Sequence, residues 1–207
     1  MTVLDRSPAG LGRMTVLLAE DGDAPVPGLP AWVRDWAVGA GAATEDASGS
    51  APDVAVSRVF RTHRGAVLLL RRDPAGPPRR IVAAVQEHEA DRPVVAAAAS
   101  AATACRAGLR IVHAVPRSFG ERSVGLAEAV ERGHRLVASV GGAEELGVTV
   151  RRDLVRAWPH EILDETLDAD LLVVGGPRPN GPAELGLTAR AAVVHAQCSV
   201  LVVPRAG

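Results

Sequence analysis

From residue 80 to the end of the chain, short apolar runs alternate with longer stretches whose apolar positions follow a helical period. An apolar run of four to eight residues is typical of a buried strand, and a period near 3.6 residues is typical of an amphipathic helix. The pattern predicts strands within 79–86, 109–116, 147–155, 169–176 and 198–204, and helices within 91–108, 123–147, 159–169 and 183–197.

Strands that alternate with helices favour a parallel sheet with helices on both faces, because right-handed crossovers place each helix over the sheet. Local signals at the helix starts agree with this assignment. Asp91 precedes the Ala-rich helix as a candidate N-cap, Pro93 falls in its first turn, and Pro159 begins a later helix. We therefore predict an α/β domain over residues 80–207.

Residues 1–79 are less regular, and we predict a small irregular N-terminal segment there. The pattern indicates a strand within 14–22, a short helix within 29–39, a loop or disordered linker over 39–52, and two strands within 53–60 and 65–72. The Pro-rich run 72–80 has the composition of a linker into the regular domain.

Composition narrows the class of protein. The 207 residues are 47% hydrophobic with a formal net charge of −1, which is typical of a soluble globular protein and indicates neither a nucleic-acid nor a membrane partner. The first twenty residues hold no sustained apolar run, so we expect no signal peptide and a cytoplasmic location.

The reactive residue types are sparse. All 23 basic residues are arginines, so a Walker-type phosphate lysine and Schiff-base chemistry are excluded. Cys105 and Cys198 lie in apolar stretches and are predicted to be free core thiols. The histidines fall on different elements. Residues 87–89 are the only local cluster of residue types that bind metals, and adjacent side chains in a strand or helix point apart. We therefore expect no metal site and no catalytic residue.

Four segments of the chain are similar to a known family: RRIVAAV, LRIVHAVP, GVTVRRDLV…PHEILDETLDADLLVVGG and, above all, LGLTARAAVVHAQCSVLVVP. Through these segments, residues 80–204 resemble the universal stress protein family. In the family that last segment typically reads Leu-Gly-Ser-Val-Ser, then a helix, then Cys-Pro-Val-Leu-Val-Val. The resemblance implies an open five-stranded parallel sheet in the order 3-2-1-4-5, an adenine-nucleotide α-hydrolase-like arrangement. It also implies that residues 1–79 are a shortened first copy of a tandem.

Family members that bind ATP hold it in the crevice between the first and fourth strands, where the sheet order reverses. By resemblance, the candidate nucleotide-binding residues here lie at the ends of the first two strands, in the loop after the fourth strand and at the start of the last helix. They are Ala84, Val85, Gln86, Ala114, Gly175, Gly176, Arg178, Gly181, Gly186, Leu187 and Thr188.

The sequence departs from the family at each part of that crevice. Gln86 stands where the family has Asp, and Leu187 stands at the hydroxyl position, with Thr188 one residue late. The loop is shorter than in the family and holds three prolines, at 177, 179 and 182, each of which removes a backbone donor; Arg178 is the one compensating charge. Glu87, Glu89 and Asp91 add negative charge beside the phosphate position.

These departures leave three candidate functions. The favoured one is a non-enzymatic stress-response or regulatory protein whose nucleotide cleft is degenerate and holds no cofactor. The second is a member that binds ATP with magnesium through the 175–188 loop and the helix start. An enzyme of the wider adenine-nucleotide α-hydrolase-like group is the third, and the lack of its Ser-Gly-Gly and His-Ile-Gly-His motifs argues against it.

The last strand raises a question of assembly. Residues 199–203 are apolar along their length and lie at an edge in the family's topology, so something must pair with them. In the family the partner is usually the same strand of a second copy, and we expect a homodimer. Residues 66–71 resemble the corresponding strand of a first domain and are a competing partner within the chain.

Overall fold

The computed structural model describes residues 14–18, 29–37, 43–46, 50–63, 65–71, 76–115, 124–140, 147–157, 161 and 167–207. The strands in these ranges are β1 (Met14–Leu18), β2 (Ala43–Asp46), β3 (Ala66–Leu70), β4 (Arg80–Val85), β5 (Gly108–Val115), β6 (Val150–Arg156), β7 (Leu171–Gly175) and β8 (Ser199–Val203). The helices are α1 (Ala31–Ala37), α2 (Pro52–Thr62), α3 (Arg92–Cys105), α4 (Val124–Ser139) and α5 (Leu187–His195).

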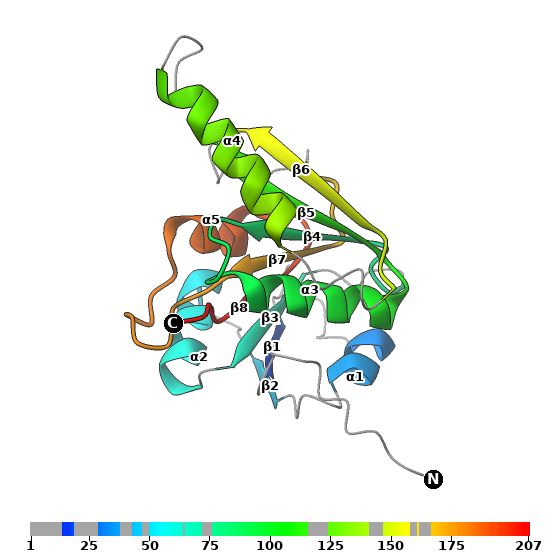
Figure 1. The fold of residues 1–207 in the computed structure, drawn as a ribbon. Helices are drawn as coiled ribbons and strands as arrows, with labels where there is room; N and C mark the ends of the chain where they lie inside the picture. Colours follow the sequence, from blue (N-terminus) through cyan, green and yellow to red (C-terminus); the bar gives the residue numbers. More distant parts are fainter. Residues whose placement is uncertain are drawn as a thin grey trace.

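All eight strands join one sheet in the order β2-β1-β3-β8-β7-β4-β5-β6 (Figure 1). The five strands of the C-terminal part are parallel to one another and stand in the order β8-β7-β4-β5-β6. When these five strands are numbered along the chain from β4 and read from β6 to β8, their order is 3-2-1-4-5. The predicted order is therefore confirmed. The helix predicted within 159–169 lies largely outside the described residues.

The N-terminal part is more regular than we predicted from its sequence. The expected strand, helix and strand within 14–22, 29–39 and 65–72 are present as β1, α1 and β3. Two expectations were wrong, because residues 43–46 of the expected loop form strand β2, and the expected strand within 53–60 is helix α2. β1 pairs in parallel with both β2 and β3, so this segment extends the sheet.

Helix α2 was missed because two periodicities compete in its sequence. DVAVSRVF alternates at the start like a strand, yet its buried residues Ala55, Val56, Val59 and Phe60 follow the helical spacing, and Val54 is exposed. Pro52 in the first turn fixes a helical φ and loses no hydrogen bond there. Burial of this face against the sheet stabilises the helix over the strand.

Strand β8 is paired on both sides within the chain. It lies parallel to β7 and antiparallel to β3, with Leu68 opposite Leu201 and Val67 opposite Val202. The pairing with residues 66–71 that competed with a homodimer is the one that forms. Strand β3 therefore occupies the edge at residues 199–203 through which we expected a second copy to pair, and the homodimer itself stays a prediction.

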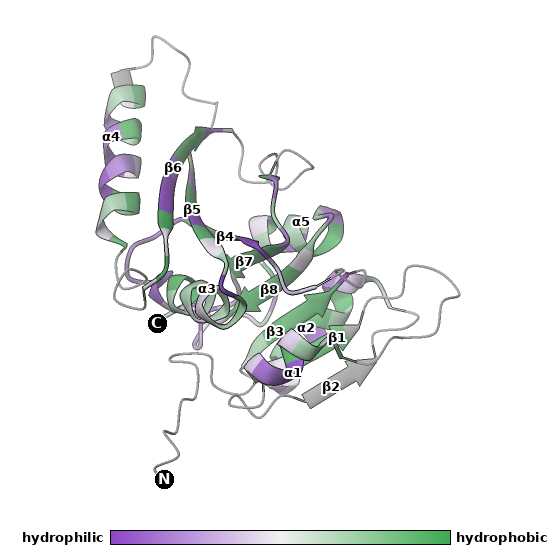
Figure 2. Ribbon diagram, turned by 90° about the vertical axis from the view of Figure 1, so that its right-hand side faces the viewer, coloured by the Kyte–Doolittle hydropathy of each residue, from purple (hydrophilic) through white to green (hydrophobic). Residues whose placement is uncertain are grey.

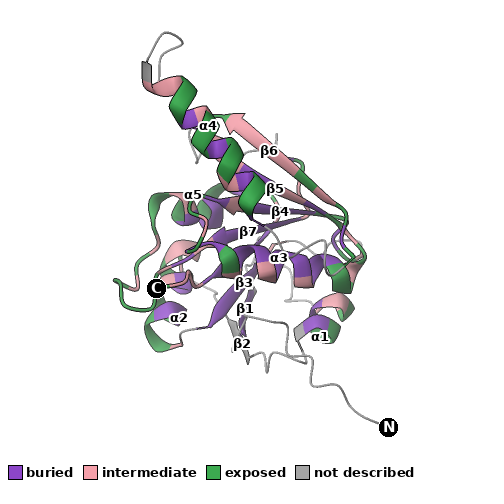
Figure 3. Cartoon of the chain, in the orientation of Figure 1, coloured by how far each residue is buried: buried purple, intermediate pink, exposed green. Residues whose placement is uncertain are grey.

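The two faces of the sheet bury separate cores. One face carries α1, α3 and α4, and its cluster takes Leu68 from β3 and Leu201 from β8. The other face carries α2 and α5, and takes Leu69 and Val200 from the same strands. Figures 2 and 3 show hydrophobic, buried central strands, whereas edge strand β6 carries charged residues and is only partly buried. Such charges protect an edge from pairing with other chains.

The described helices include none that is long and apolar enough to span a membrane. The two cysteines are free, as predicted, and half-buried.

Burial raises the pKa of the Cys105 and Cys198 thiols to about 11. At pH 8, each unit by which the pKa rises lowers the fraction of thiolate about tenfold. We therefore expect both thiols to react about 100-fold more slowly with a disulfide reagent in the folded protein than in the denatured protein. Stopped-flow labelling of native and denatured protein at pH 8 measures the ratio. Equal rates in the two states would contradict the burial argument.

Candidate functional site

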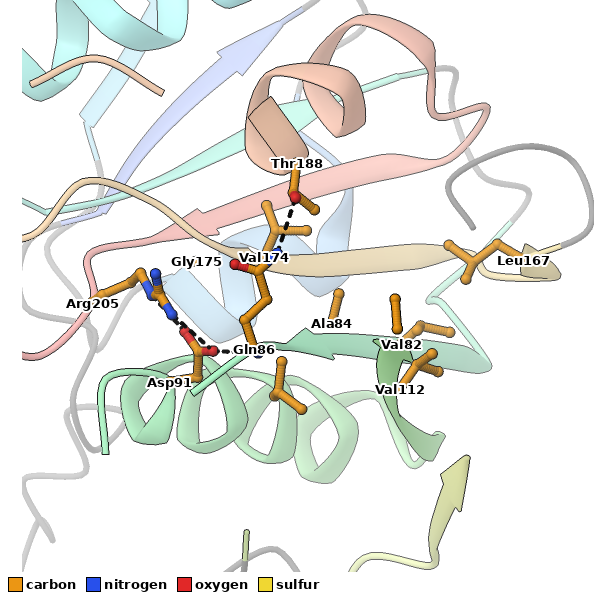
Figure 4. Close-up of a pocket in the computed structure, with 12 residues that line it drawn as sticks. Val82, Ala84, Gln86, Asp91, Val112, Leu167, Val174, Gly175, Thr188 and Arg205 are labelled. Atoms are coloured by element: carbon orange, nitrogen blue, oxygen red, sulfur yellow. Dashed lines mark hydrogen bonds and ion pairs between the residues drawn. The ribbon is translucent and has the colours of Figure 1, made fainter. Parts of the chain in front are cut away.

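A pocket opens at the carboxyl ends of β4 and β7, the strands between which the sheet order reverses (Figure 4). This is where open α/β sheets generally bind ligands. Its apolar lining comes mainly from strands β4, β5 and β7 and comprises Val82, Ala84, Val85, Val112, Ala114, Leu167 and Val174. Its other lining residues are Gln86, Asp91, Gly175, Thr188 and Arg205.

The polar rim is bridged by a hydrogen bond from β4 to α5. Gln86 Nε2 donates to the Thr188 hydroxyl at 3.1 Å, as the dashed line in Figure 4 shows. Thr188 therefore supplies the hydroxyl in the pocket, while Leu187 is 88% exposed and does not line it. The sequence placed Leu187 at the family's hydroxyl position with Thr188 one residue late, and in the structure Thr188 is the residue that lines the pocket.

Asp91 is the N-cap residue of α3, as predicted, but its side chain makes no cap hydrogen bond to that helix. Its Oδ2 accepts hydrogen bonds from the backbone N–H groups of Gln86 and Glu87, at 2.6 and 2.8 Å. Its carboxylate also receives the Arg205 guanidinium, with Nε 2.7 Å from Oδ1 and Nη2 3.1 Å from Oδ2. Asp91 is only 2% exposed, so a buried carboxylate at the end of β4 is neutralised by the chain's own arginine.

Arg205 reaches the pocket because the C-terminal residues cross the same edge of the sheet. Its backbone N–H donates to the Pro177 carbonyl at 3.3 Å, and the N–H of Ala206 donates to the Ala90 carbonyl at 2.9 Å. The tail thus lies between the loop after β7 and the loop before α3. The Arg205 side chain is 15% exposed, so the tail holds it within the rim of the pocket.

Gly175, the last residue of β7, and the glycines that follow it serve packing and turn geometry. A Cβ on Gly175 would lie 2.9 Å from Arg205 Cδ and 3.0 Å from Asp91 Oδ1, and one on Gly176 would lie 2.9 Å from Val202 Cγ1. The N–H of Gly176 donates to the Val203 carbonyl, and that of Gly181 donates to the Arg178 carbonyl. Two backbone donors that a phosphate would need are therefore used within the protein.

Charge at the rim is paired across the pocket. Arg178 Nη2 lies 2.6 Å from Glu87 Oε2, and Arg205 Nη2 lies 3.5 Å from Glu87 Oε1. Glu89 contacts Arg92 and His88, away from this pair. The acidic residues that we expected to repel phosphates are thus matched by arginines, and Arg178 is committed to Glu87.

The structure brings six of the eleven candidate residues to the pocket, namely Ala84, Val85, Gln86, Ala114, Gly175 and Thr188. Of the others, Gly176 packs on Val202, Arg178 and Gly181 share a turn, Gly186 is the N-cap residue of α5, and Leu187 is exposed. Sequence reasoning missed Arg205. Arg205 lies two residues beyond the last strand, and the carboxyl ends of parallel strands meet at one edge of the sheet. This position in the sequence could have placed Arg205 at the pocket.

Within the described ranges, no group of three or more His, Cys, Asp and Glu side chains gathers as metal ligands would. His88 contacts Glu89 through Nδ1 and the Ser139 carbonyl through Nε2. His113, on the face of β5 that meets α4, has Nδ1 2.8 Å from the Val85 carbonyl oxygen. Both histidines make structural contacts.

A sequence model of the Universal stress protein family matches residues 78–204. A search of curated proteins found no match to the chain. The comparison with solved structures found a functionally unknown protein, PA1789, from Pseudomonas aeruginosa PAO1, at 16% identity and a TM-score of 0.55, covering 97% of this chain and 95% of that one.

A putative universal stress protein from Pseudomonas aeruginosa UCBPP-PA14 is similar at 16% identity and a TM-score of 0.55, with 96% of this chain and 95% of that chain covered. A universal stress protein from Archaeoglobus fulgidus shares 24% identity over 60% of this chain and 98% of its own, with a TM-score of 0.47. The two Pseudomonas structures show that the fold of almost the whole chain, including the N-terminal part, has counterparts.

Proposed function

Because the chain belongs to the universal stress protein family through residues 78–204, we propose that it is a non-enzymatic stress-response or regulatory protein whose nucleotide cleft is degenerate. The cleft lies where α/β sheets of this order bind ligands, but its polar groups bond to one another. A nucleotide would have to displace these internal partners before it could bind.

The Arg205–Asp91 ion pair carries this proposal. It places a buried carboxylate and a guanidinium at the rim, with Gly175 packed against both. A phosphate that displaced Arg205 would leave Asp91 buried and unpaired beside a second negative charge, which is costly. Gln86 adds to this by donating to the one hydroxyl of the pocket's lining.

The second candidate, ATP with magnesium, draws support from Thr188. Its hydroxyl faces the pocket from the first turn of α5, and a helix N-terminus favours anions. A magnesium ion would have to bridge the phosphates and the carboxylates of Glu87 and Asp91.

Titration calorimetry of the full chain with ATP, ADP and AMP, with and without magnesium, separates the two candidates. We expect a Kd weaker than about 100 μM for each, a binding free energy no more favourable than about −5.5 kcal/mol. We also expect ADP release from ATP at the rate of the buffer alone. Low-micromolar ATP binding would overturn the degenerate cleft, and turnover would overturn the non-enzymatic assignment.

Gln86→Asp is the matched gain-of-binding variant. The shorter side chain breaks the bridge to Thr188 and restores the family's carboxylate, so we expect the Kd for ATP to fall about tenfold, or about 1.4 kcal/mol. Leu187→Ser is the control, and because Leu187 is exposed outside the pocket we expect no change. A gain from Leu187→Ser alone would contradict the position assigned to that residue.

A further inference from the structure

We propose that residues 204–207 form a C-terminal latch, with the Arg205 guanidinium as the internal ligand of a guanidinium-binding site made by Asp91, Glu87 and Gly175. The latch holds the phosphate side of the cleft closed against anionic ligands. This role in excluding anionic ligands rests on the function proposed above, whereas the affinity of the site for a guanidinium group does not.

The site is built around the planar cation. Asp91 meets two of its nitrogens at 2.7 and 3.1 Å, a two-point arrangement that matches the guanidinium fork, and Glu87 Oε1 lies 3.5 Å from Nη2. Asp91 is fixed by the N–H groups of Gln86 and Glu87, so the carboxylate keeps its orientation when the cation leaves. A lysine ammonium cannot make the same paired contact.

The site also accommodates the aliphatic part of the side chain. Gly175 leaves room for Arg205 Cγ and Cδ, which would lie 3.0 and 2.9 Å from a Cβ at that position. The backbone bonds of Arg205 to Pro177 and of Ala206 to Ala90 hold the tail in register. Contacts from five residues therefore converge on the segment that follows the last strand, namely Asp91, Glu87, Gly175, Pro177 and Ala90.

Chemical rescue tests the site directly. Arg205→Ala keeps Cβ, and N-ethylguanidinium has the shape of the atoms removed. We expect the variant to melt about 6 °C lower than the natural chain, because a buried carboxylate loses its partner. N-Ethylguanidinium at about ten times its Kd should raise that Tm by about 3–5 °C, as a ligand of the folded state does. Tetramethylammonium at equal ionic strength should not.

Two controls make the rescue specific. Arg178→Ala removes the other arginine that contacts Glu87, at a pair that is half exposed, so we expect a small loss of Tm and no rescue. Arg205→Ala combined with Asp91→Asn should also show no rescue, because the carboxylate is gone. Equal rescue by both cations, or none by N-ethylguanidinium, would overturn the guanidinium site.

The natural chain provides a test that does not depend on a variant's folding. Since Arg205 Nε donates to buried Asp91, its Nε–H should exchange slowly with water in ¹⁵N NMR, whereas that of Arg178 should exchange fast. Fast exchange at Arg205 would overturn the latch. Anion exclusion is measured separately, as tighter pyrophosphate binding by Arg205→Ala combined with Asp91→Asn; unchanged pyrophosphate binding would overturn the blocking role while leaving the rescue result intact.

Discussion

Leu201→Lys is expected to abolish folding of the whole chain. Leu201 is fully buried at the centre of β8, opposite Leu68 on β3 and Val173 on β7. An ammonium group at this point has no partner within the core, and the cost of about 5 kcal/mol or more rivals the total stability of a typical domain. We expect loss of the cooperative melting transition in circular dichroism and aggregation in light scattering.

The same substitution at Leu187 is the matched control. That side chain is 88% exposed at the first residue of α5, so Leu187→Lys should melt within about 1 °C of the natural chain. A Leu201→Lys protein that stays folded and merely changes from dimer to monomer would show that β8 pairs between chains in solution. It would contradict the β3–β8 pairing within one chain.

The pairing of β3 with β8 explains how a short N-terminal segment can be ordered at all. Three strands alone bury little apolar surface, but β3 adds to a sheet that already has two covered faces. Helix α2 then packs beside α5, where Arg190 Nε lies 2.8 Å from Asp53 Oδ2. The segment thus occupies the place that a second copy would need.

The C-terminal sheet could be predicted from sequence because its signals are local and consistent. Strands β4, β7 and β8 are nearly continuous apolar runs, as expected for strands covered on both faces, and β4 and β7 are followed by the helical stretches of α3 and α5. The resemblance to a family then supplied the strand order. Helix α2 was not predictable in the same way, because its strand-like start is overridden by burial of Val56 and Phe60 against the sheet.

The position of the pocket was predicted from the sequence, but the interactions among its polar groups were not. The strand ends and the helix start located the pocket, yet sequence spacing could not say which of Leu187 and Thr188 faces it. The direction of a side chain at a helix N-terminus depends on where the first turn begins, and Gly186 as N-cap residue turns Thr188 inward. Arg205 was missed because its partner, Asp91, is 114 residues away and had been assigned to a helix cap.

Asp170→Ala should produce the second large effect, a fall in stability of about 3 kcal/mol. Asp170 Oδ2 accepts the backbone N–H groups of Arg79 and Arg80, each at 2.9 Å, and its Oδ1 lies 2.6 Å from Arg80 Nη2. The carboxylate thereby joins the start of β4 to the residue that precedes β7. The loss corresponds to a Tm about 6 °C lower or more, measured by calorimetry, with Asp170→Asn intermediate because its carbonyl oxygen still accepts.

The pH dependence of this loss follows from the pKa of Asp170. Partial burial acts to raise that pKa, but the hydrogen bonds from the Arg80 side chain and from the two backbone N–H groups outweigh it and hold the pKa below its usual value. A carboxyl group whose pKa is lowered by folding stabilises the protein above its unfolded pKa of about 3.9, and loses this contribution as the pH falls through the folded value. The difference in unfolding free energy between the natural chain and Asp170→Asn should therefore be constant from about pH 5 to 8 and shrink below about pH 4. A difference that stays constant down to the acid transition would show that the charge of Asp170 contributes nothing, and that its hydrogen-bonding oxygen alone joins the two strands.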